Sequence, residues 1–313
     1  MGHTFLAGVD IGATNLRVAV SNAEGEVEAR RAVPFPGGAP EEVLAKVRRT
    51  IDDLARGVWV GAEVAAIGVV MPGSVDPARG VVSTPANLPG WGDVPVAAML
   101  SGGRTPVAVE NDANAAALGE GWRGAAQGLR DYVFIALGTG IGAGVVADGR
   151  LLHGAHFLAG EIAFFAMTRE QLRRPGWDDC LESVAGGRAL AARAREILGA
   201  SAGPGDLFDA AESGDGRARA VVQEVQEFLA MAIVQACALL DPEAVVLGGG
   251  VATAQGERLL GPVRDLALGC LPAKPRIALS ELGEDAQLAG ALRLAADMLE
   301  RGAGRAREPH ATA

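Results

Sequence analysis

One segment of the chain places a carboxylate beside hydrogen-bonding amides, an arrangement that suits general acid–base chemistry. It reads Glu110-Asn111-Asp112-Ala113-Asn114 and runs into an Ala-rich stretch that predicts the start of a helix. The helix dipole favours an ionised Asp112, which would accept a proton from a hydroxyl group while Asn111 holds a neighbouring hydroxyl. Helix N-capping by Asn111 or Asp112 explains the same residues structurally. Since one residue cannot serve fully in both roles, we assign hydroxyl binding to Asn111 and the base to Asp112.

A glycine-containing turn near the N-terminus offers groups for an anionic phosphate. The turn follows an apolar strand that ends at Asp10, and its side chains include Thr14 and Asn15. Gly12 lets the backbone approach a phosphate, while Thr14 and Asn15 donate hydrogen bonds to its oxygens. The carboxylate of Asp10 at the strand end suits a Mg²⁺-bound water. An ordinary hairpin with polar turn residues is the structural alternative.

Two later glycine segments have the same character. Gly138-Thr139-Gly140-Ile141-Gly142 resembles a dinucleotide fingerprint, but a strand follows it where a Rossmann unit needs a helix. A glycine turn between two strands suits backbone donors that contact terminal phosphates, although turn geometry alone also explains the glycines. Farther on, Gly249 and Gly250 follow an apolar strand and would let an adenosine moiety lie against the backbone.

The elements that position these groups occur twice. Strands are predicted at 5–10, 16–21 and 26–33 and again at 131–137, 143–147 and 150–153, with a glycine at the reversals. Further helices are predicted at 41–56, 183–198, 218–240 and 286–300. The repeated meander indicates an internal duplication, with two similar α/β lobes facing a cleft. We place the small N-terminal lobe at 1–114 plus 300–313 and the large C-terminal lobe at 115–299.

The composition argues against a nucleic-acid-binding, secreted or membrane protein. The 313 residues carry a formal net charge of −10, which argues against a surface that binds nucleic acid. No signal peptide is visible, and the longest apolar run, 228–240, is interrupted by Gln235, so no membrane span is expected. The three cysteines are far apart, as in reduced cytosolic proteins. We therefore expect a cytoplasmic protein that acts on a small molecule.

Together the motifs resemble those of the ROK family of sugar kinases, which are glucokinase-like. The resemblance runs from about residue 6 to about residue 299 and rests on ordered motifs at 10–17, 87–91, 111–116, 138–142 and 159–162. It implies the α/β fold of the actin-like ATPases (ribonuclease H-like) and the use of ATP with Mg²⁺. It also implies transfer of a phosphoryl group to a hydroxyl of a hexose or a related amino sugar or cyclitol.

The resemblance further implies a role for each motif residue. Asp112 would be the catalytic base, and Asp10 would act through Mg²⁺. The residues that would bind the sugar are Asn111, Glu161, Glu182, Gly73, Ser74 and Asn87. Those that would contact the nucleotide are Gly12, Thr14, Asn15, Gly138, Thr139, Gly140, Gly249 and Gly250.

The chain departs from the family pattern at its zinc motif. Family members have a His and three Cys that bind a structural zinc, and the His also contacts the sugar. Here Phe164 stands at the His position, and Cys180 is the one cysteine that remains. A structural zinc needs four protein ligands, so we predict none. Phe164 either changes sugar recognition, towards an amino sugar or a cyclitol, or turns into the core and fills the space that zinc would take.

Other members of the family suggest alternatives. Some ROK proteins are sugar-sensing repressors with a helix-turn-helix ahead of the first strand, and here that strand is expected near Phe5. A sugar sensor without catalytic activity is a second alternative, prompted by the missing His, although Asp112 is retained. Some relatives use polyphosphate in place of ATP, which the motifs do not exclude. Relatives also commonly form homodimers, which we expect here by resemblance only.

Overall fold

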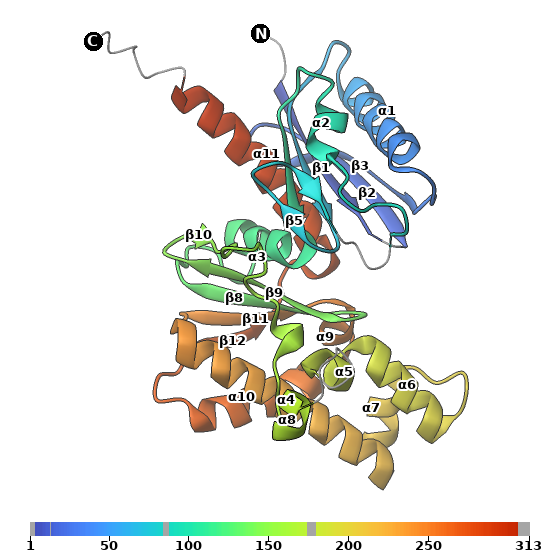
Figure 1. The fold of residues 1–313 in the computed structure, drawn as a ribbon, viewed down its shortest axis with the longest axis vertical. Coiled ribbons are helices and arrows are strands. Elements are labelled where there is room, and N and C mark those ends of the chain that lie inside the picture. Colours follow the sequence, from blue (N-terminus) through green and yellow to red (C-terminus); the bar gives the residue numbers. More distant parts are fainter. Residues whose placement is uncertain (1–3, 13, 84–87, 174–179, 306–313) are drawn as a thin grey trace. The chain divides into compact units, whose positions relative to one another are not determined.

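The computed structural model describes residues 4–12, 14–83, 88–173 and 180–305. The chain divides into two compact units. Unit 1 comprises Met1–Trp122 with Asp285–Ala313, and unit 2 comprises Arg123–Glu284. Each has its own five-stranded sheet (Figure 1).

The sheet of unit 1 has the strand order β3-β2-β1-β4-β7. Strands β1, β2 and β3 form the antiparallel meander, and β4 and β7 are added parallel to β1. The bounds are β1 (Thr4–Ile11), β2 (Asn15–Ser21), β3 (Val27–Pro34), β4 (Glu63–Met71) and β7 (Val107–Asn111). A short hairpin of β5 (Val75–Asp76) and β6 (Val81–Val82) and the helices α2 (Val96–Ser101) and α3 (Asp112–Arg123) complete the connections.

Alternating side chains cover both faces of this sheet. Ala7 and Val9 of β1 lie in one core cluster with buried residues of α1 (Pro40–Val58). Leu6 lies in another cluster with Leu288 and Leu292 of α11 (Ala286–Arg305). Because successive strand side chains point to opposite faces, the sheet is packed between α1 and α11.

Unit 2 repeats this topology, with the order β10-β9-β8-β11-β12. Strands β8, β9 and β10 are antiparallel, and β11 and β12 are parallel to β8. The bounds are β8 (Tyr132–Leu137), β9 (Ile141–Ala147), β10 (Arg150–Leu151), β11 (Ala244–Gly248) and β12 (Arg276–Leu279). The shared strand order confirms the duplicated meander that the sequence predicts.

The helices of unit 2 follow in chain order, with two single-turn 3₁₀ helices among them. They are η1 (Ile162–Phe164), α4 (Arg169–Arg173), α5 (Leu181–Ala185), α6 (Gly187–Leu198), α7 (Pro204–Glu212), α8 (Gly216–Leu240), α9 (Gly250–Gln255), α10 (Glu257–Cys270) and η2 (Gly283–Asp285). The single helix expected at 183–198 is divided into α5 and α6, because Gly186 adopts an extended backbone (φ −65°, ψ 150°).

Helix α8 is the central helix of the unit 2 core. By length and composition alone it is apolar enough to cross a bilayer, which is weak evidence, since core helices of soluble proteins pass the same test. Val225, Leu229 and Ile233 are buried against the sheet and the neighbouring helices. The apolar composition of α8 is therefore explained by core packing.

The unit boundaries of the structure lie after Trp122 and after Glu284, and not at 114/115 and 299/300 as the sequence predicts. All of α3 up to Trp122 and the whole of α11 belong to unit 1, so the closing helix is not part of the large C-terminal unit. Glycines permit this packing. A β-carbon at Gly68 of β4 would lie 1.8 Å from the carbonyl oxygen of Ala291, and one at Gly290 would lie 1.8 Å from that of Ala115. Helix α11 therefore lies directly on the backbone of β4 and α3.

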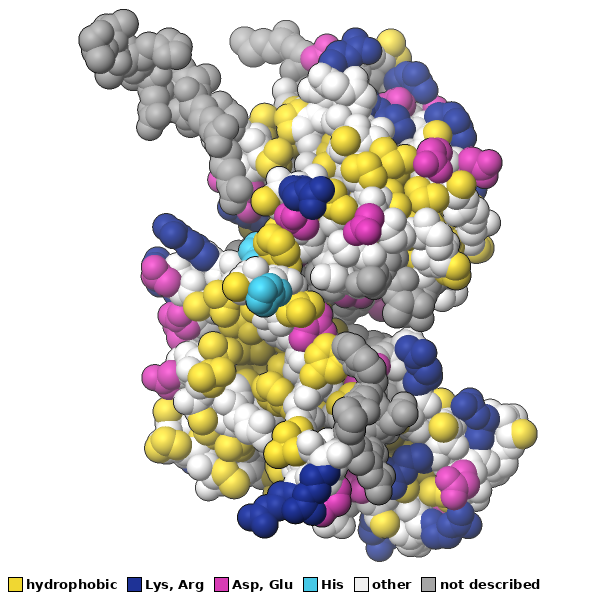
Figure 2. All heavy atoms as spheres, viewed as in Figure 1, with side chains coloured by type: hydrophobic (Ala, Val, Ile, Leu, Met, Phe, Trp, Pro, Cys, Tyr) yellow, Lys and Arg dark blue, Asp and Glu magenta, His cyan; other side chains and the backbone are white. Residues whose placement is uncertain are grey.

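Charged side chains are spread over the surface of each unit. In the view of Figure 2, basic and acidic groups are interspersed with polar and apolar ones on both units.

Replacing Gly68 with Ala should destabilise unit 1, because the new methyl group would overlap the backbone of α11. Overpacking of this kind costs about 1–3 kcal/mol. The control is Gly57→Ala in α1, where a β-carbon meets nothing within 4 Å and helix propensity improves. Urea unfolding should give a lower midpoint for Gly68→Ala and an equal or higher one for Gly57→Ala. Equal midpoints for Gly68→Ala and the wild type would contradict the close packing.

Candidate functional site

The amide of Asn111 organises the turn between β7 and α3. Its Oδ1 accepts hydrogen bonds from the backbone N–H groups of Ala113 (2.9 Å) and Asn114 (3.3 Å), which caps α3. Its Nδ2 donates to the carbonyl oxygen of Gly73 at 3.0 Å. The capping role therefore belongs mainly to Asn111, and one Nδ2 hydrogen is left over from these bonds for a ligand.

Asp112 follows as the first residue of α3 and is half-buried. Its Oδ1 accepts the N–H of Ala113 at 2.9 Å, which fixes the orientation of the carboxyl group. Because Asn111 supplies the cap, a proton-accepting role for Asp112 is compatible with the helix start.

Glu110 is a buried supporting residue that sequence reasoning did not single out. It is 2% exposed, and its Oε1 accepts the N–H of Asn111 and the Nδ2 of Asn114, both at 2.9 Å. The Oδ1 of Asn114 is buried without a hydrogen-bond partner. A buried acid one residue before the Asn-Asp pair was a signal in the sequence, since such acids need partners.

Asp10 forms an ion pair in the first glycine turn. Its Oδ2 lies 2.6 Å from Nη2 and 2.7 Å from Nε of Arg17, the residue opposite it in the β1–β2 register. Burial raises the pKa of Asp10, and the Arg17 guanidinium opposes this rise. The Mg²⁺ role predicted for Asp10 would fall to Oδ1, since Oδ2 is held by Arg17. The opposed register was the sequence signal for this pair, which we did not predict.

Both glycine turns use a backbone donor internally. The N–H of Gly12 donates to the carbonyl oxygen of Asn15 (2.9 Å), and the N–H of Gly138 donates to that of Gly140 (3.0 Å). In the first turn the exposed Thr14 and Asn15 present their side chains at the end of the hairpin. The glycine N–H groups themselves therefore close the turns rather than point to a ligand.

Two other glycine segments pack against the turn of unit 2. A β-carbon at Gly187, the first residue of α6, would lie 2.3 Å from the carbonyl oxygen of Gly138. One at Gly249 (φ 87°) would lie 2.6 Å from that of Leu137. The structure thus places Gly187 against Gly138 and Gly249 against Leu137, with Gly250 beginning α9. It adds Gly187, which the Gly-Gly pair inside a helical pattern could have indicated.

Glu161 and Glu182 are two carboxylates of unit 2 whose charges influence one another. Burial raises the pKa of Glu161, and the negative charge of Glu182 raises it further. The Oε2 of Glu182 accepts the N–H of Ile141 at 2.8 Å, and a β-carbon at Gly140 would lie 2.2 Å from that oxygen. Gly140, predicted as a phosphate contact, is thus in contact with a carboxylate.

Phe164 does not turn into the core. It is 40% exposed at the end of η1, whereas the following Phe165 packs against the unit 2 core. Cys180 is buried at the start of α5. Among the described residues, no group of three or more His, Cys, Asp and Glu side chains suits a metal ion.

The predicted sugar residues separate into two described groups. Gly73 and Asn111 are hydrogen-bonded in unit 1, with Ser74 next in the chain, and Glu161 lies near Glu182 in unit 2. Asn87 lies outside the described residues.

Comparison with known proteins decides the family. The ROK family model matches residues 6–298, nearly the whole chain. The chain belongs to the ROK family. ROK relatives include a glucokinase of Halalkalibacterium halodurans, 32% identical over 93% of this chain and 94% of that protein. An N-acetylmannosamine kinase of Salmonella paratyphi A is 32% identical over 92% of this chain and 97% of that protein.

Solved ROK structures share the fold. The ROK hexokinase of Thermus thermophilus superposes with a TM-score of 0.85 at 31% identity and covers 95% of this chain and 100% of its own. A ROK glucokinase of Streptomyces griseus, solved with glucose and AMPPNP, gives 0.75 at 29% identity and covers 94% and 99%. The fold is therefore that of the actin-like ATPases, as the sequence motifs imply.

Glu161→Gln should stabilise the protein at neutral pH. A carboxyl group whose pKa is raised by folding favours the folded state when protonated, and this advantage is lost as pH rises through the raised pKa. The uncharged amide of Gln at position 161 does not ionise, so the variant keeps the stability that Glu161 loses as it ionises. Urea unfolding should give a higher midpoint for Glu161→Gln than for wild type at pH 7, and a smaller difference near pH 4, where an ordinary glutamate, with a pKa of about 4.3, is largely protonated.

The control is Glu196→Gln on the exposed surface of α6, which should change little at either pH. A pH-independent gain for Glu161→Gln would point to packing and not to ionisation.

Proposed function

We propose that this ROK-family carbohydrate kinase transfers the γ-phosphoryl group of ATP to a hydroxyl of a hexose or a related amino sugar or cyclitol. The observation that carries the proposal is the Asn111 cap, which holds Asp112 at the end of β7 without using it as the main cap. Glucokinase and N-acetylmannosamine kinase relatives that match over nearly the full chain support the same reaction.

Asp112 is the base in this proposal. Its carboxylate accepts the proton of the attacking hydroxyl as that oxygen bonds to the γ-phosphorus and the bond to ADP breaks. The remaining Nδ2 hydrogen of Asn111 binds a neighbouring hydroxyl. Glu161 and Glu182 accept hydrogen bonds from other sugar hydroxyls, since each carboxylate takes several donors. Gly73, Ser74 and Asn87 complete the sugar contacts.

The nucleotide contacts come from the glycine turns. Thr14 and Asn15 donate side-chain hydrogen bonds to phosphate oxygens, and Thr139 does so from the second turn. Gly12 and Gly138 keep these turns tight, and Gly249 and Gly250 border the adenosine. Asp10 would hold Mg²⁺ through water, and the ion would supply charge neutralisation at the phosphates. Gly140 contacts phosphate from the second turn, where it also lies against the carboxylate of Glu182.

Phe164 supports a substrate that differs from plain glucose. Its exposed ring follows Glu161 in η1, and its N–H donates to the carbonyl oxygen of Glu161 at 3.2 Å. An aromatic ring offers apolar contact but no hydrogen bond to a hydroxyl. An acylated amino sugar, or a cyclitol that needs fewer hydrogen bonds on that side, suits this surface better than glucose does.

The same assignment suggests where the enzyme is located, how it assembles and what it binds. We expect a cytoplasmic homodimer that binds a small-molecule sugar and neither nucleic acid nor membrane. A non-catalytic sugar sensor is the alternative function, and its family support is a ROK transcriptional regulator that superposes with a TM-score of 0.81 at 25% identity. The retained Asp112 favours the kinase, and ADP formation separates the two.

Asp112→Asn should abolish phosphoryl transfer, because the amide cannot accept the proton. Loss of a general base lowers kcat by about 10²–10⁴-fold. The measurement is coupled ADP release over a panel of hexoses, amino sugars and cyclitols, with ATP and with polyphosphate as donors.

The matched control is Asp93→Asn, an exposed residue of unit 1 with φ 55°, a conformation that Asn also tolerates. It should keep full activity. An Asp112→Asn enzyme with undiminished turnover would remove Asp112 from the mechanism, and a wild type inactive with every sugar and donor would favour the sensor.

Removing divalent metal with a chelator and then restoring Mg²⁺ should leave the activity and the urea midpoint unchanged, because we propose no structural zinc. A structural zinc contributes folding free energy outright, so its loss would lower the midpoint. Metal analysis of the purified protein should find less than one zinc per chain. A stoichiometric zinc whose removal lowers the midpoint would refute the proposal.

A further inference from the structure

A hollow of about 810 Å³ opens in unit 1 at the edge of the sheet where β1 and β4 begin. Thr4 of β1, Glu63 at the start of β4 and Thr105 just before β7 line it. Asp10 and Asn111 lie near the other ends of these parallel strands. Since β4 has 9 residues at about 3.3 Å each, roughly 25 Å separates the hollow from the candidate catalytic groups.

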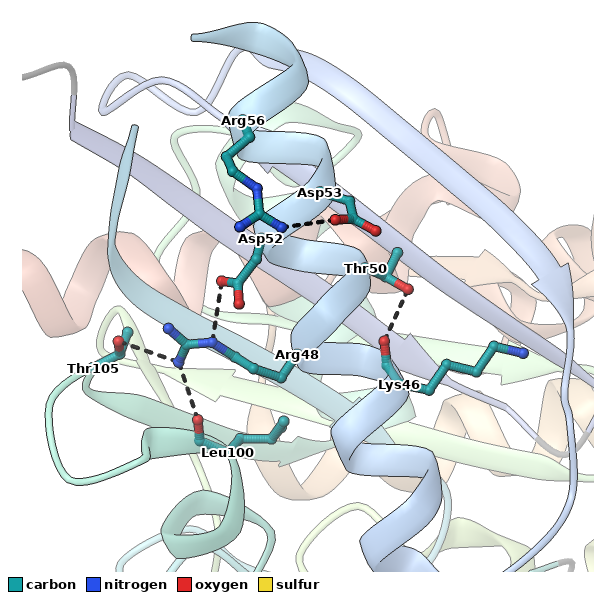
Figure 3. Close-up of polar contacts among 8 residues, drawn as sticks. All are labelled: Lys46, Arg48, Thr50, Asp52, Asp53, Arg56, Leu100 and Thr105. Atoms are coloured by element: carbon teal, nitrogen blue, oxygen red, sulfur yellow. Dashed lines mark hydrogen bonds and ion pairs between the residues drawn. The ribbon is translucent and has the colours of Figure 1, made fainter. Parts of the chain in front are cut away.

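Arginines from two elements face this hollow. Arg48 and Arg56 stand two helical turns apart on one face of α1, with Asp52 between them, as Figure 3 shows. Arg104 comes from the turn that follows α2. Helix α1 and this turn thus supply the positive charge on two sides of the space.

Arg48 is held in a fixed orientation. Its Nε donates to Asp52 (3.2 Å), and its Nη1 lies 3.3 Å from the carbonyl oxygen of Leu100 and 3.4 Å from the Oγ1 of Thr105 (Figure 3). These contacts tie α1 to the end of α2, which is a structural role. They leave Nη2 outside the bonds that the structure records, so a guanidinium with five N–H donors retains a pair for a ligand.

The other two arginines have more donors to spare. Arg56 pairs through Nη2 with Asp53 at 2.8 Å and is 65% exposed at its side chain. No described residue bonds to the guanidinium of Arg104. The lining therefore holds Arg48, Arg56 and Arg104 against the acids Asp52 and Glu63, in a chain whose formal net charge is −10. Since Asp52 pairs with Arg48 and Asp53 pairs with Arg56, the donors available to an anion are the guanidinium of Arg104 and the spare N–H groups of Arg48 and Arg56.

The remaining lining is suited to hydroxyl groups. Carboxylates of Asp52 and Glu63 accept hydrogen bonds, and Ser101 and Thr105 offer hydroxyls. Guanidinium groups bind phosphate bidentately, and the volume falls within the range of small-molecule sites. We propose that this hollow binds a phosphorylated sugar, with the phosphate on the arginines and the sugar hydroxyls on the acids. The site is separate from the candidate catalytic residues, and the proposal does not depend on the proposed kinase reaction.

Titration calorimetry of the full chain with glucose 6-phosphate, inorganic phosphate and glucose tests this site. We expect glucose 6-phosphate to bind at least tenfold more tightly than either component. Arg48→Met and Arg104→Met should each weaken that binding by roughly 10- to 100-fold, because each removes a charge-assisted hydrogen-bond donor set. Met keeps the aliphatic stem of Arg48. The recorded hydrogen bond of Arg104, to the carbonyl oxygen of Ser101, is made by its backbone N–H and not by the side chain that is replaced.

The matched control is Arg49→Met, on the same helix α1 but outside the lining, which should bind as the wild type does. Urea midpoints of all variants show whether a loss of binding reflects unfolding, and Arg104→Met decides the question if Arg48→Met is unstable. Binding that survives both Arg48→Met and Arg104→Met lies elsewhere, for example at the catalytic site, and overturns the proposal. Absence of binding, or phosphate alone binding as tightly as glucose 6-phosphate, overturns it too.

Discussion

The cap that Asn111 places on α3 is the interaction on which the site of unit 1 depends. One side chain satisfies two N–H groups at the helix start and also ties that start to the carbonyl oxygen of Gly73. Without it, Asp112 would have to supply the cap itself, and the segment after β4 would lose its link to β7. Glu110 supports the same turn from the buried side through the N–H of Asn111. In the proposed mechanism Asn111 supplies the cap, and Asp112 is left to act as the base.

The turn after the first strand of each sheet is bordered by different chemical groups in the two units. In unit 1 the turn after the first strand is bordered by an ion pair between Asp10 and Arg17. In unit 2 the equivalent turn is bordered by other glycine backbones and by the carboxylate of Glu182. The shared strand order shows common architecture, while the groups that border the two turns differ.

Much of the architecture could be predicted from the sequence, because alternation of apolar residues and glycine reversals report local structure. The meander of 5–33 and its repeat at 131–153 are examples. The unit to which α11 belongs could not be predicted from the sequence. It depends on the contact between Gly68 and Ala291, which are far apart in the chain. The break between α5 and α6 was missed because Gly186 and Gly187 were read as part of one helix. Asn111 was assigned to a ligand although its side chain is largely committed to the cap.

The contacts of Glu182 limit how the sugar specificity of the enzyme can change. Its Oε2 is bonded to the β9 backbone beside the glycine turn, and its charge is felt by Glu161. Under the proposed assignment, a substitution of Glu182 that suits a new sugar would also remove the hydrogen bond to the turn that we propose contacts phosphate. Affinity for the acceptor and affinity for the donor would then be linked through a single side chain. Under the same assignment, new acceptor specificities should arise more readily at positions such as Phe164, whose side chain is 40% exposed.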